Sequence, residues 1–150
     1  MAKFEKGIAI NPNDIISYQE EGIVSMELLH NESGSITLFA FGKGQQLSPH
    51  SAPLDALIQA IDGQFVLTLD GEDHLIKAGE IFMIPAGHVH SLRADNNFKM
   101  LITMISVNRK IDFNKYSIFS QINNKQEIDA LLPIMYCLAV KEAHWEYEKE

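Results

Sequence analysis

Short apolar runs separated by turn residues fill the chain from Gly22 to Ser106. In the run 65–69, Phe65, Leu67 and Leu69 alternate with more polar or smaller neighbours, which is the period-two pattern of a strand with one buried face. The runs follow one another closely with no helical period between them, as is typical of an antiparallel sandwich or barrel. The predicted strands are residues 22–30, 35–41, 56–61, 65–69, 74–78, 81–85, 89–94 and 98–106.

Turn residues mark the joints between these runs. Asp70-Gly71 separates two apolar runs and predicts a two-residue hairpin, because a type I′ turn needs a positive φ at both central positions. The polar stretch 1–20 contains a further predicted turn at 11–14, which reads Asn-Pro-Asn-Asp.

The spacing of apolar residues becomes helical from Gln126 onward. Asn124 with Glu127 three residues later suits a helix N-cap pair. We therefore expect a β-barrel domain over 1–107 and a mainly helical extension over 108–150. Its apolar face packs either on the barrel of the same chain or against a second subunit. The residues on one stripe are Ile128, Leu131, Leu132, Met135, Leu138 and Ala139.

Composition agrees with one globular domain and a short appendage. Of the 150 residues, 46% are hydrophobic and 21% charged. A chain of this size buries about two-thirds of its unfolded surface, so it needs no disulfide or structural metal to fold. Cys137 is the single cysteine, which excludes an intrachain disulfide and favours a reducing compartment.

Charge and targeting signals narrow the classes of partner. The chain has 12 Lys and Arg against 20 Asp and Glu, a formal net charge of −8. Without a run of basic residues it lacks the features of a phosphate-backbone binder, so no nucleic-acid partner is expected. Residues 1–14 contain Glu5 and no continuous apolar region, which argues against a secretory signal. No stretch approaches ~18 apolar residues, so we expect no membrane partner and a cytoplasmic location.

Two motifs with fixed spacing carry the chemical information. The first motif is Gly44, His50 and Gly63, and the second is Gly79, Pro85, Gly87 and His90. Together with the strand-rich context they resemble the cupin superfamily, and most of all its short, stand-alone bacterial members. The resemblance covers about residues 34–106 and implies an all-β jelly-roll barrel (a double-stranded β-helix) that pairs as a homodimer.

The resemblance implies a metal-ligand set that this chain carries only in part. Metal-binding cupins use two histidines and a glutamate of the first motif with the histidine of the second. Here His50 and His90 stand at two of those positions, whereas Ala52 and Ala56 replace the second histidine and the glutamate. Ala94 also stands where the second motif ends in asparagine.

Completing a metal site would need other ligands, because transition metals generally take three or four converging donors. The candidates are Asp55, Gln59 and His88. Alternate residues of a strand share a face, so Asp55 and Gln59 point away from the interior if Ala56 faces it, unless a bulge intervenes.

Two functions follow from these residues. In the first, the barrel mouth binds a small-molecule ligand, and the pocket is lined by His50, Ala52, Ala56, Ile58 and His90. In the alternative, which the resemblance implies, the chain is a metal-dependent enzyme of the dioxygenase or isomerase type found among cupins, with a divalent Zn, Ni, Fe or Mn ion held by His50 and His90. The missing ligands favour the first, and no catalytic residue is assigned. A purely structural interaction module would leave the paired histidines unexplained.

Overall fold

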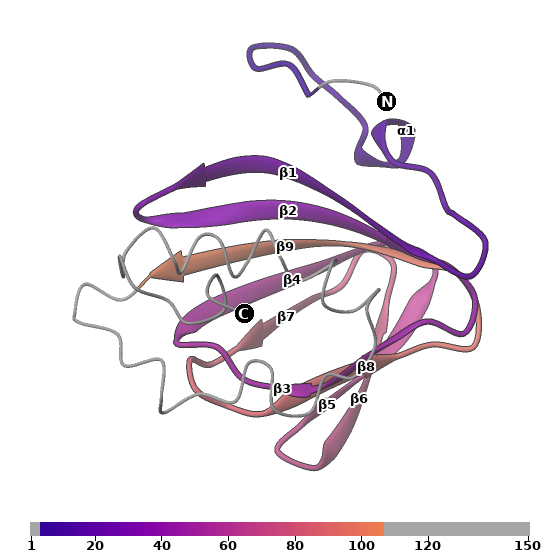
Figure 1. The fold of residues 1–150 in the computed structure, drawn as a ribbon, viewed down its shortest axis with the longest axis vertical. Helices are drawn as coiled ribbons and strands as arrows, with labels where there is room; N and C mark the ends of the chain where they lie inside the picture. Colours follow the sequence, from indigo (N-terminus) through magenta and orange to yellow (C-terminus); the bar gives the residue numbers. More distant parts are fainter. Residues whose placement is uncertain (1–3, 107–150) are drawn as a thin grey trace, which may run out of the picture.

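The computed structural model describes residues 4–106, which form two antiparallel sheets around one interior (Figure 1). The five-stranded sheet has the order β1-β2-β9-β4-β7, and the four-stranded sheet has the order β3-β8-β5-β6. The elements are α1 (Pro12–Ile15), β1 (Ile23–Asn31), β2 (Gly34–Phe41), β3 (Gln46–His50), β4 (Leu54–Asp62), β5 (Gln64–Leu69), β6 (Glu72–Lys77), β7 (Ile81–Ile84), β8 (His90–Arg93) and β9 (Phe98–Ser106).

The predicted barrel of antiparallel sheets is confirmed within residues 4–106, with one short helix and one strand that the pattern did not predict. Every run that was predicted as a strand forms one, with ends shifted by at most two residues. The additional strand is β3, in which only Leu47 and His50 are buried and Pro49 interrupts the apolar pattern. Its hydrogen bonding to β8 decides its conformation, and a single sequence does not show that partner.

The turns follow the local chemistry of their residues. Asp70 and Gly71 both have positive φ, 49° and 85°, which confirms the predicted hairpin between β5 and β6. The predicted turn at 11–14 forms part of a single helical turn instead. Asn11 caps it by accepting a hydrogen bond from the Asn13 amide at 3.0 Å, and Pro12 occupies the first helical position.

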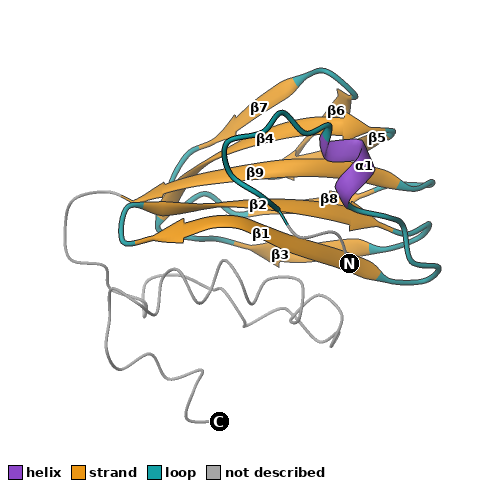
Figure 2. Ribbon diagram, turned by 90° about the horizontal axis from the view of Figure 1, so that it is seen from above, coloured by secondary structure: helices purple, strands orange, loops and turns teal. Residues whose placement is uncertain are grey.

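The five-stranded sheet buries its inner face and part of its outer face. Alternation along β2 sends Phe39 and Phe41 to the barrel interior and Leu38 and Ala40 to the outer face. The outer face is covered by the segment around Ile16, so α1 lies outside the barrel against this sheet (Figure 2). The segment around Ile16 therefore packs on the outer face of the five-stranded sheet.

Several expectations fall outside the described residues. The helical extension over 108–150 and the domain boundary at 107 lie there, and the homodimer and the cellular location stay predictions. Within residues 4–106 the structure contains no helix that is long and apolar enough to span a bilayer.

Gly63, in the turn between β4 and β5, offers a direct test of the fold. Its φ is +71°, and an added Cβ would press into the backbone carbonyl of Asn97. Gly63→Ala is therefore expected to lower the free energy of unfolding by about 2–3 kcal/mol in urea melts, because it combines strain with a clash. Gly71→Ala is the matched control: φ is +85° there with open space around the new Cβ, so about 1 kcal/mol is expected. Equal losses would contradict the close approach of the Asn97 backbone.

Candidate functional site

The two ends of the barrel interior differ in chemistry. At one end Phe98 stacks on Phe41 with ring centroids 4.4 Å apart, and Phe65 lies 4.7 Å from the same ring. The opposite end is where β2 and β4 begin and where β9 and β7 finish, since Gly34 pairs with Ile105 and Ala56 with Ile84. We call this second end the histidine end, because His50 and His90 lie there.

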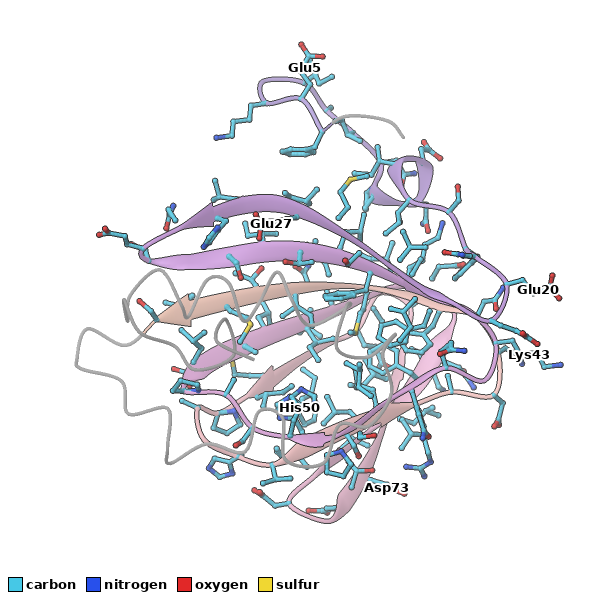
Figure 3. The ribbon with its side chains drawn as sticks, viewed as in Figure 1. Glu5, Glu20, Glu27, Lys43, His50 and Asp73 are labelled. Carbon is cyan, nitrogen blue, oxygen red and sulfur yellow. The ribbon has the colours of Figure 1, made fainter. Side chains whose placement is uncertain are left out.

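The two motif histidines contact each other at the histidine end. His50 is the last residue of β3 and His90 the first residue of β8, and they are direct partners across the two strands. Their ring centroids are 4.3 Å apart and the ring planes are inclined by 58°. His50 is buried and His90 half-buried, and Figure 3 shows the His50 side chain between the two sheets.

Backbone carbonyl groups fix the tautomer of both imidazoles. Nδ1 of His50 lies 2.7 Å from the carbonyl oxygen of Ser48, and Nδ1 of His90 lies 3.0 Å from that of His88. A carbonyl only accepts, so each Nδ1 must carry the proton and donate it. Each Nε2 then presents a lone pair that can accept a hydrogen bond.

Burial keeps both rings neutral. Burial first, and then the neighbouring His90, lower the pKa of His50 to about 3, against a smaller opposing effect of the Ser48 carbonyl. Burial also lowers the pKa of His90, while the His88 carbonyl and the Asp70 carboxylate act in the opposite direction. At neutral pH the pair therefore offers two hydrogen-bond acceptors and no charge.

The small and apolar residues predicted to line the site face the interior. Ala52, Ala56 and Ile58 are all buried members of the inner core. Ala56 lies between Met104 of β9 and Ile84 of β7 in the sheet register. The expected alternation along β4 is also confirmed, because Asp55 is exposed and Gln59 is only partly buried between buried neighbours.

The structure does not bring the three compensating ligands to the histidine pair. The Asp55 carboxylate accepts a hydrogen bond from the Ala86 amide at 2.9 Å on the outside of the barrel. Gln59 pairs with Ile81, which is 64% exposed, so both lie on the outer face. His88 is exposed and its Nδ1 contacts the Asp70 carboxylate at 2.5 Å.

The donor set therefore does not fit the metal centre that the cupin motifs imply. Within residues 4–106, no group of three or more His, Cys, Asp or Glu side chains is placed to hold a metal ion. His50 and His90 supply two nitrogen donors, and a transition-metal site generally needs three or four. We derive no chemical step through a metal.

A surface cleft of about 810 Å³ lies at the other end of the barrel, around the turn after β2. Figure 3 shows Glu20 and Lys43, two of its residues, at this edge. Its lining comes from exposed loops, and neither motif histidine takes part. The candidate functional site is therefore the histidine end of the barrel.

The sequence patterns did not single out two polar residues of the barrel interior as site candidates. Ser35 and Thr37 lie on β2 and are 3% and 1% exposed. The alternation along the strand could have identified them, because both lie on the same face as Phe39 and Phe41, where buried apolar residues are expected.

Comparisons with known proteins match part of the chain to a domain family. Residues 37–106 match the cupin domain. A conserved protein of unknown function from Streptococcus pyogenes is 27% identical with a TM-score of 0.67, over 70% of this chain and 92% of that one. A cupin 2 conserved barrel domain protein from Leptotrichia buccalis is 37% identical with a TM-score of 0.60, over 62% of this chain and 45% of that one. No protein of curated function matches.

A third structure has the same fold at lower identity. It is a cupin superfamily protein from Desulfitobacterium hafniense, 24% identical with a TM-score of 0.65, and the match covers 71% of this chain and all (100%) of that one. The family match and the arrangement of strands agree with the two motifs around His50 and His90. Residues 37–106 therefore form a cupin domain, and small bacterial cupins of unknown function are among the structural neighbours of the chain.

Proposed function

We propose that this cupin binds a small molecule at the histidine end of the barrel, through hydrogen bonds that the ligand donates to Nε2 of His50 and Nε2 of His90. The observation that carries the proposal is the pair of contacting, neutral imidazoles whose Nδ1 atoms are both bonded to backbone carbonyls. Each ring has one remaining polar atom, and both are acceptors.

The two neighbouring acceptors favour a ligand with two neighbouring donors. Each hydrogen bond that the ligand donates would contribute about 0.5–1.5 kcal/mol. A molecule with adjacent O–H or N–H groups, such as a vicinal diol, would satisfy both Nε2 atoms at once. Ala56, Ile84 and Met104, which form one row of the inner core at this end of the facing sheet, would add apolar contacts. This combination of apolar walls with a few converging polar atoms is typical of small-molecule sites.

Alanine at two motif positions fits binding better than metal chemistry. Ala52 and Ala56 stand where metal-binding cupins carry larger, ligating side chains, and both are buried in the interior. Their methyl groups offer a ligand van der Waals contact and compete for none of its hydrogen bonds. The same two substitutions remove the donors that a metal would need.

Binding of a vicinal cyclohexanediol, measured by calorimetry, tests the proposal. The diol is expected to bind, its dimethyl ether is not, and His50→Asn or His90→Asn should each weaken diol binding about tenfold or more. Asparagine keeps an N–H for the Ser48 or His88 carbonyl and removes the Nε2 acceptor, so the fold is retained. His74→Asn is the control, because His74 packs against Phe82 with ring centroids 5.0 Å apart, away from the pair.

Two results would overturn this function. One is equal binding of the diol by the wild-type chain and by His50→Asn. The other is one transition metal per chain in untagged protein, lost in His50→Asn and retained in His74→Asn, measured by elemental analysis. That result would put a metal where we place the ligand.

A further inference from the structure

The interior holds two hydroxyl groups that its own hydrogen bonding does not use. Ser35 and Thr37 of β2 are almost completely buried, at 3% and 1% exposed. Among residues 4–106, Ser35 Oγ and Thr37 Oγ1 have no hydrogen-bond partner. Most buried hydroxyl groups in proteins are bonded, so two such groups two residues apart on one strand need an explanation.

Both side chains face the barrel interior. Along β2 they alternate with Ile36 and Leu38, and Leu38 belongs to the cluster on the outer face. Their register partners on β9 are Met104 for Ser35 and Ile102 for Thr37, and both partners belong to the inner core. Cross-strand partners share a face, so the two hydroxyl groups lie on the inside.

The register also places them at the histidine end. Ser35 is the second residue of β2, and its row across the sheet continues through Met104 to Ala56 and then to Ile84, the last residue of β7. His50 and His90 lie at the same end of the facing sheet. The interior at this end therefore has acceptors on one sheet and hydroxyl groups on the other.

We propose that Ser35 and Thr37 form a second polar contact for the ligand, opposite His50 and His90, and that the ligand is an uncharged polyhydroxylated compound. This inference rests on the proposed function, because it assigns the other side of the same molecule. One part of the ligand donates hydrogen bonds to the imidazoles. Another part exchanges hydrogen bonds with the two hydroxyl groups.

The ligand class follows from donor and acceptor chemistry. Each Nε2 only accepts, whereas a serine or threonine hydroxyl both donates and accepts. A ligand hydroxyl group complements both kinds of partner, but a carboxylate offers only acceptors and cannot donate to the imidazoles. On β1 the register partner of Thr37 is Glu27, whose carboxylate is exposed and lies 3.7 Å from Nδ1 of His30, the register partner of Ser35.

The thermal stability of the unliganded chain tests whether the hydroxyl groups lack partners. Ser35→Ala with Thr37→Val keeps the shape and removes both polar atoms, so the midpoint of thermal unfolding is expected to rise by about 5 °C. Thr103→Val makes the same change on the outer face of β9, where Thr103 is half-buried, and should shift the midpoint by less than about 1 °C. A lower midpoint for the double variant would show that the hydroxyl groups are bonded within the protein, and would overturn the inference.

Calorimetry with two probes tests the second contact. Myo-inositol carries hydroxyl groups around its whole ring, whereas the vicinal cyclohexanediol can satisfy only the imidazoles. The double variant is expected to bind inositol at least tenfold more weakly than the wild-type chain and to bind the diol with unchanged affinity. Thr103→Val should bind both probes with unchanged affinity. If His50→Asn weakens diol binding but the Ser35 and Thr37 double variant binds inositol as tightly as the wild-type chain, this inference is wrong and the proposed function stands. Loss of His50 dependence for both probes would overturn the proposed function itself.

Discussion

Replacing Phe98 with alanine is expected to lower the free energy of unfolding by about 4 kcal/mol. Phe98 begins β9 and is fully buried, and its ring stacks on Phe41 at 4.4 Å and lies 4.7 Å from the ring of Phe65. Removing it deletes the centre of a three-ring cluster and leaves a cavity between the two sheets. Urea unfolding at neutral pH, followed by near-ultraviolet circular dichroism, measures the loss.

Phe82→Ala is the matched control for this result. Phe82 of β7 is only partly buried at the margin of the inner core, so about 1–2 kcal/mol is expected. The Phe98 cluster lies at the end of the barrel away from His50 and His90. Diol binding by folded Phe98→Ala should therefore stay within about twofold of the wild-type value. A loss for Phe98→Ala no larger than that for Phe82→Ala would contradict the aromatic cluster as the main support of that end.

The strands could be predicted from the sequence because most of them carry their own signal. In β5, Phe65 and Leu67 are buried and Val66 between them is only partly buried, as the period-two pattern predicted. Asp70 and Gly71 specify a turn by their backbone preferences alone. β3 carries no such signal, since Pro49 and two polar residues surround Leu47, and its conformation depends on pairing with β8.

The candidate site was predictable where family spacing fixed a position, and not where strand register decides the neighbours. Fixed spacing identified His50 and His90, and the structure brings them into contact. The compensating ligands were proposed from proximity along the chain. Asp55 precedes Ala56, but that single step moves its side chain to the opposite face of the sheet. Conversely, Ser35 is distant from His50 in sequence, and the register of β2, β9 and β4 places it at the same end.

A cost in stability accompanies the polar groups of the histidine end. An interior built only for stability would fill these positions with apolar side chains, as the Phe98 end does. Here His50, Ser35 and Thr37 are buried instead, and each adds a polar group to a largely apolar core. Proteins commonly retain such residues where function requires them, at the expense of stability. This contrast between the two ends supports binding at the histidine end.

The stability of the wild-type chain is expected to fall relative to that of His50→Asn as the pH is lowered below about 6.5. The folded-state pKa of His50, about 3, lies below its ordinary value of 6.5. Between these values the unfolded chain binds a proton at this residue that the folded chain excludes, so acid favours unfolding. The full contribution is present above pH 6.5, and the loss is complete only below the folded-state pKa.

The size of this effect follows from proton linkage. A pH of 5 lies about 1.5 units below the pKa of the imidazole in the unfolded chain. At about 1.4 kcal/mol per unit, the free energy of unfolding is expected to fall by about 2 kcal/mol. The measurement is the difference in unfolding free energy between the wild-type chain and His50→Asn, from urea melts at pH 7, 6 and 5. Asp73, whose carboxyl pKa is lowered by hydrogen bonds from Arg93 and Thr68, also reduces stability in acid. It is present in both proteins, so its effect cancels in the difference. Parallel curves for the two proteins would mean that His50 binds protons equally well folded and unfolded. That result would contradict a buried, neutral imidazole at this position, and with it the acceptor on which the proposed ligand contact depends.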